Sequence, residues 1–138
     1  MDKFNKMLAG GEPMVLSVFR FMTGLLLFQY GVAKILKFPV LPFFVNIPPL
    51  ITVAGTLELV LGALLMVGLW TRPVAFILSG EMAFAYFMGH MFKVPAAPVF
   101  TPILNGGNAA ILFCFACLYF FFAGGGMWSV DAMMGKKR

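Results

Sequence analysis

The sequence predicts an all-α protein, a four-helix transmembrane bundle with both termini in the cytoplasm. Its composition is 62% hydrophobic and only 11% charged, whereas about a quarter of the residues in a soluble domain are charged. Four apolar runs approach the roughly 20 residues that a spanning helix needs. Together with their connections these runs use nearly all 138 residues, so the sequence predicts a single integral membrane domain, 1–138.

The predicted spans cover residues 14–36, 50–70, 74–92 and 109–128. Only Thr71, Arg72 and Pro73 separate the second span from the third. A threonine hydroxyl can cap a helix and proline fits its first turn, so we expect a tight hairpin here. The connections 37–49 and 93–108 are rich in proline, which prevents the helices from continuing through them.

The distribution of Lys and Arg outside the spans predicts the orientation, because these residues favour the cytoplasmic side. The side that holds both termini carries Lys3, Lys6, Arg72, Lys136, Lys137 and Arg138, and the other side carries Lys37 and Lys93, with Lys34 close to the boundary. Trp70 and Trp128 are expected at the cytoplasmic headgroup level. The net charge of +5 is thus explained by topology, and we expect no nucleic-acid partner.

Four charged residues fall inside the predicted spans: Arg20, Lys34, Glu58 and Glu81. An ionised group at mid-membrane costs roughly 2.5 to 3.5 kcal/mol, so each needs a partner. Small residues at helical spacing flank each charge and allow close helix packing. Depth, counted at about 1.5 Å per residue, pairs Arg20 with Glu81 and Lys34 with Glu58. Such pairs either only fix the order of the helices or form a proton, quinone or substrate site.

Two further features bear on chemistry. Cys114 and Cys117 have C-x-x-C spacing, which puts both sulfurs on one helix face as a candidate redox pair. No nearby cation or helix N-terminus would activate the thiols, so we expect them to pack as small hydrophobic groups. His90, the only histidine, could relay protons. One imidazole without clustered carboxylates does not make a metal or haem site, so we expect no metal and no cofactor held by the chain itself.

These residues resemble the DoxX family of small bacterial membrane proteins. The resemblance rests on the order and spacing of several short stretches that together cover nearly the whole chain. They are Arg20, Tyr30-Gly31-Val32-Ala33-Lys34, Glu58-Leu59-Val60-Leu61-Gly62, Val67-Gly68-Leu69-Trp70-Thr71-Arg72, Glu81-Met82 with Ala85-Tyr86, His90, Asn105-Gly106-Gly107 and Gly124-Gly125-Gly126-Met127-Trp128-Ser129-Val130-Asp131. Asn108 departs from the family, which often has Glu after the Asn-Gly-Gly stretch.

The resemblance implies a multi-pass protein of the bacterial inner membrane, in a family named for subunits of quinol oxidase and thiosulfate:quinone oxidoreductase systems. We therefore expect a small subunit of a membrane redox system. It would anchor a partner oxidoreductase or contact quinone, with Arg20, Lys34, Glu58, Glu81 and His90 as candidate polar-site residues. Membrane lipid and a second copy of the chain are further expected partners. The rival hypothesis is a transporter or carrier that binds a small lipophilic molecule with the same buried charges.

Overall fold

The computed structural model describes residues 1–90 and 101–135, and every regular element in these residues is helical, as predicted. The elements in order are α1 (Asp2–Gly31), which continues as the π-helix η1 (Val32–Leu36), the short 3-10 helix η2 (Pro42–Phe44), α2 (Pro49–Val67), α3 (Thr71–Ala85), which continues as the π-helix η3 (Tyr86–His90), α4 (Pro102–Asn105), α5 (Asn108–Ala123) and α6 (Val130–Met133).

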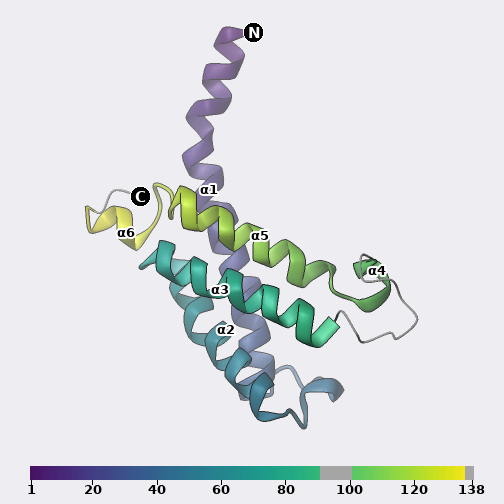
Figure 1. The fold of residues 1–138 in the computed structure, drawn as a ribbon. Helices are drawn as coiled ribbons and strands as arrows, with labels where there is room; N and C mark the ends of the chain where they lie inside the picture. Colours follow the sequence, from purple (N-terminus) through teal and green to yellow (C-terminus); the bar gives the residue numbers. More distant parts are fainter. Residues whose placement is uncertain (91–100, 136–138) are drawn as a thin grey trace.

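The long helices associate as two pairs, α1 with α2 and α3 with α5 (Figure 1). The short connection 68–70 joins the pairs, so the predicted hairpin is present. Its predicted residues were wrong, because the second span ends at Val67 instead of residue 70 and Thr71, Arg72 and Pro73 belong to α3. Fully buried apolar side chains from all four helices fill the centre, and they are Leu27, Leu65, Leu78 and Phe120.

Glycines allow α1 and α2 to approach closely. A Cβ atom added at Gly24 would lie 2.6 Å from the backbone nitrogen of Met66, and one added at Gly62 would lie 2.8 Å from that of Phe28. The predicted packing of small residues is therefore confirmed for this pair. In the third span, where we expected Gly89 to pack in the same way beside Glu81, a Cβ atom would have no neighbour within 4 Å among the described residues.

The first helix is longer than the predicted span. It begins at Asp2, and residues 2–10 are exposed, so that α1 projects beyond the other helices (Figure 1). Leu16 is its first buried residue. The stretch Asp2–Leu36 and the helix Pro49–Val67 are long and apolar enough to cross a membrane, and Asn108–Ala123 is a shorter apolar helix.

The predicted ends of the last two spans need correction. Helix α5 ends at Ala123 instead of residue 128, because Gly124 and Gly126 adopt positive φ angles of 83° and turn the chain back. Trp128 therefore lies in a loop. Helix α3 begins at Thr71 instead of residue 74 and its helical continuation reaches His90; residues 91 and 92 lie outside the described part of the chain.

Candidate functional site

Lys34 and Glu58 form a buried ion pair, as the sequence predicted. The Lys34 Nζ atom lies 2.9 Å from both carboxylate oxygens of Glu58. The side chains are 13% and 3% exposed, respectively. Together with Glu81 of α3, these residues form what we call the charge cluster.

The local fold holds Lys34 in place. Gly55 leaves room for its stem, because a Cβ atom there would lie 2.8 Å from the Cβ of Lys34. The rings of Tyr30 and Phe44 have their centroids 5.7 and 5.5 Å from Nζ, within cation–π range. Lys37 donates a hydrogen bond of 2.6 Å to the carbonyl of Phe44 and so secures η2 beside the cluster.

Glu81 completes the cluster. Both of its carboxylate oxygens are buried, and no described group donates a hydrogen bond to them. Its carboxyl group lies close enough to that of Glu58 and to Lys34 to interact with both electrostatically. The structure therefore brings together three of the four charged residues predicted inside the spans.

Arg20 lies elsewhere, and its predicted pairing with Glu81 was wrong. Arg20 is 2% exposed, and its guanidinium group donates hydrogen bonds to four backbone carbonyls. The acceptors are the carbonyl of Gly125 for Nε (2.8 Å), those of Leu65 (2.8 Å) and Met66 (2.6 Å) for Nη1, and that of Trp128 for Nη2 (2.7 Å). Arg20 thereby satisfies carbonyls at the C-terminal end of α2, where a positive charge is favourable.

Two side chains that sequence reasoning missed complete this end of the bundle. Asp131 accepts the backbone N–H groups of Trp70 (2.8 Å) and Thr71 (2.9 Å) at the start of α3. Ser17 accepts the N–H of Trp128 at 3.0 Å. The predicted capping role of the Thr71 hydroxyl was wrong, because this oxygen is buried with no partner among the described residues. The glycine triplet before Asp131 was the one sequence signal for a returning segment.

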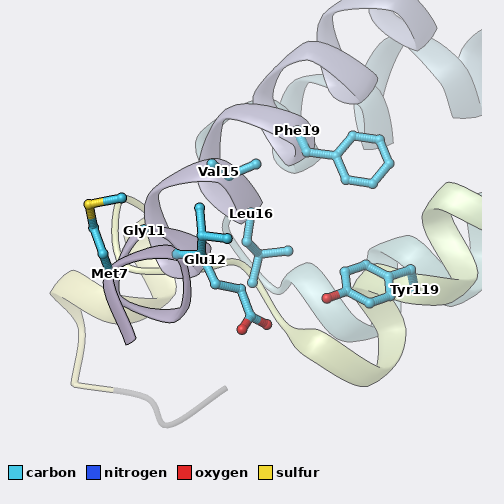
Figure 2. Close-up of a pocket in the computed structure, with 8 residues that line it drawn as sticks. Met7, Gly11, Glu12, Val15, Leu16, Phe19 and Tyr119 are labelled. Atoms are coloured by element: carbon cyan, nitrogen blue, oxygen red, sulfur yellow. The ribbon is translucent and has the colours of Figure 1, made fainter. Parts of the chain in front are cut away.

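An open groove of about 420 Å³ lies where α1 leaves the bundle (Figure 2). The side chains of Phe19 on α1 and Tyr119 on α5 border it, and Glu12 brings a carboxylate to the same space (Figure 2). Phe19 also packs edge-on against Phe120, with 4.8 Å between the centroids, which joins α1 to α5 beside the groove. The other lining residues are Met7, Leu8, Gly11, Val15 and Leu16.

Comparison with known proteins identifies the family. The DoxX family model matches residues 15–91, more than half of the chain and the part that contains the charge cluster. The chain belongs to the DoxX family. An uncharacterized protein of Haemophilus influenzae is 40% identical over 129 residues, which cover 91% of this chain and 95% of that protein. No solved structure matches. DoxX membership and the long apolar helices together identify a membrane protein.

The other predicted site residues of this DoxX protein lie outside the charge cluster. Cys117 is fully buried and near enough to Glu81 to interact with it electrostatically. Cys114 is half-buried, and Ser79 donates a 2.8 Å hydrogen bond to its carbonyl. Neither thiol is in a disulfide, and their redox role stays a prediction. His90 ends η3, about two turns beyond Glu81. No three described His, Cys, Asp or Glu side chains converge as metal ligands would.

Proposed function

We propose that this DoxX protein is a four-span subunit of the bacterial inner membrane that gives a partner oxidoreductase contact with membrane quinone. The groove between α1 and α5 carries this proposal, because it is an apolar cleft with polar groups beside it at one end of the bundle. Its volume of about 420 Å³ is typical of small-molecule sites, which occupy roughly 300 to 1,000 Å³.

The helix lengths support four spans. Helix α3 and η3 together cover 20 residues, about 30 Å at 1.5 Å per residue, which equals the hydrocarbon thickness of a bilayer. Helix α5 has 16 residues and covers about 24 Å. Trp70 and Trp128 are both exposed, while their backbone groups bind Asp131 and Arg20, respectively. Two exposed indoles at one end of the bundle fit a headgroup interface there, which agrees with cytoplasmic termini.

The chemistry of the groove fits a quinone. A quinone has a flat ring with two carbonyl oxygens and an isoprenoid tail. The rings of Phe19 and Tyr119 offer aromatic surface for the head, and the Tyr119 hydroxyl is a donor for a carbonyl. Val15 and Leu16 offer an apolar wall for the start of the tail, and the open side of the groove would leave the rest of the tail in lipid.

The projecting part of α1 supports a role as an anchor for a partner subunit. Phe4, Met7 and Leu8 are each more than half exposed on this segment. Lys3 and Lys6 lie on the same stretch. A helix with this mixture of exposed apolar and basic side chains, outside the bundle, has surface to offer to another chain or to the headgroups of lipids.

Purification from native membranes tests the proposal. We expect quinone in the organic extract of the purified protein and subunits of an oxidoreductase in the same fraction. Tyr119→Leu should reduce the retained quinone at least severalfold, whereas Phe84→Leu, which changes an exposed aromatic residue of α3 outside the groove, should not. A different lipophilic molecule in the extract, with no redox subunit, would instead support the carrier hypothesis. Crosslinking of the same sample reports whether a second copy is present.

A further inference from the structure

We propose that Glu81 holds an exchangeable proton and donates it in a hydrogen bond to the carboxylate of Glu58, so that the charge cluster is a proton-binding site within the bundle. The inference goes beyond the proposed quinone contact, and it uses none of the residues that line the groove.

The first argument is the balance of charge in the cluster. Lys34 contacts both oxygens of Glu58 and compensates one negative charge. An ionised Glu81 would add a second negative charge, and the carboxylate oxygens that would carry it are buried. Burying an unpaired charge is strongly unfavourable, and in such a place the group is held in its neutral form. One proton makes the whole cluster neutral.

The second argument is the closeness of the two carboxyl groups. As a carboxylate, Glu81 has no hydrogen-bond donor among the described residues. The side chains of Glu58 and Glu81 nevertheless lie close enough to each other to interact. Ionised carboxylates only accept hydrogen bonds, so a hydrogen bond between these two groups needs a proton on one of them. Glu58 is the acceptor, because Lys34 stabilises its negative charge.

Within residues 1–90 and 101–135, no further group compensates a negative charge on Glu81. Among the described residues, those whose charges act on it are Glu58 from α2, Lys34 from η1 and Cys117 from α5. Lys34 is already engaged with Glu58, and the thiol of Cys117 supplies no positive charge. Tyr30 of α1 presents its ring to Lys34. Release of the proton breaks the O–H bond of Glu81, leaves the electron pair on its oxygen and gives the cluster one negative charge.

Infrared spectroscopy of the full chain in lipid nanodiscs tests the proposal, because the carbonyl stretch of a protonated carboxyl group is distinct from that of a carboxylate. We expect this band in the parent protein at neutral pH and expect it to shift in D2O. Glu81→Gln should abolish the band. Glu58→Gln should also abolish it, since Lys34 would then pair with an ionised Glu81. Lys34→Met should increase it, because both carboxyl groups lose their cation. Asp2→Asn, on the exposed start of α1, should leave it unchanged.

Absence of the band from the parent protein, or its persistence in Glu81→Gln, would overturn the proposal. Glu81→Gln should fold, since the amide keeps the shape of the acid and can donate to Glu58. If Glu81→Gln does not assemble, the parent protein is treated with dicyclohexylcarbodiimide in addition to the infrared measurement. This apolar reagent modifies protonated carboxyl groups. Modification found at Glu81 by mass spectrometry supports the assignment. Modification at Glu58 instead, or an infrared spectrum without the band, refutes it.

Discussion

The carboxylate of Asp131 accepts the backbone N–H of Thr71 at 2.9 Å, so that the returning C-terminal segment caps the start of α3. The other oxygen accepts the N–H of Trp70. An acidic group in this position satisfies N–H groups that the helix itself leaves unpaired and interacts favourably with the helix dipole. Most polar groups at this end of the bundle therefore satisfy one another, in contrast to Glu81 in the charge cluster.

Replacing Asp131 with Ala should lower the free energy of unfolding by about 1 to 2 kcal/mol, the usual effect of losing a helix cap. The free energy of unfolding of Asp131→Asn should lie between those of Asp131→Ala and the parent, because the amide keeps one acceptor. Thermal unfolding of the purified protein in detergent measures the change. Asp2→Ala, in the exposed first turn of α1, is the control and should be indistinguishable from the parent. Equal stability of the Asp131 and Asp2 variants would contradict the capping role.

Arg20→Lys should destabilise the protein by about 3 kcal/mol, because one ammonium group cannot reach carbonyls that three guanidinium nitrogens bind and some are left unsatisfied. Arg72→Lys is the matched comparison. Arg72 uses the single atom Nη1 to bind the carbonyls of Phe121 and Phe122, so an ammonium group can take its place with a much smaller loss. Denaturant titration of both variants checks the ranking, and a tolerated Arg20→Lys would contradict it.

Double-mutant cycles should show that Arg20 and Glu81 are energetically independent, whereas Lys34 and Glu58 are coupled. Arg20→Leu and Glu81→Gln should be additive within about 0.5 kcal/mol, because the residues do not touch. Lys34→Met alone should destabilise by about 3 kcal/mol, since it leaves Glu58 without its cation, and adding Glu58→Gln should recover part of the loss. The measurement is the unfolding free energy of each single and double variant. A non-additive free energy for the Arg20 and Glu81 variants would indicate that these residues do pair, in contradiction to the structure.

The predicted pairs Lys34–Glu58 and Arg20–Glu81 had different outcomes, and the difference shows what the sequence could and could not predict. The all-α class and the Lys34–Glu58 pair followed from helical spacing and from depth within the spans. The Arg20–Glu81 pair failed because depth was counted from the ends of the apolar runs. Both of the ends used were misplaced, since α1 begins far outside the bundle and α3 begins at Thr71 instead of residue 74.

The groove and the position of Asp131 could not be predicted for a related reason. Both depend on segments more than 50 residues apart in the sequence, Phe19 with Tyr119 and Asp131 with Trp70. Helical periodicity constrains which residues share one face of one helix, but it does not say which distant loop returns to that face. The glycines at 124 and 126 mark where the chain turns and leave its destination open.

Gly24→Ala should prevent normal association of α1 with α2 or reduce stability by more than about 3 kcal/mol, because the added methyl group would meet the Met66 backbone at 2.6 Å. Gly80→Ala is the matched control on α3, where a Cβ atom meets nothing within 4 Å. This second change should be neutral or stabilise by up to about 1 kcal/mol through helix propensity. Membrane expression and thermal unfolding compare them, and equal behaviour would argue against close helix packing at Gly24.

The contacts of Arg20 also impose an order on biosynthesis. As the polypeptide emerges, Nη1 can reach the carbonyls of Leu65 and Met66 once α2 has been made. The acceptors for Nε and Nη2, at Gly125 and Trp128, are translated about 60 residues later. A nascent chain that has formed α1, α2 and α3 therefore still carries an incompletely satisfied arginine, and release of the last residues from the ribosome supplies the missing acceptors. A chain that terminates before Gly125 would present this defect permanently to the proteases that survey membrane insertion.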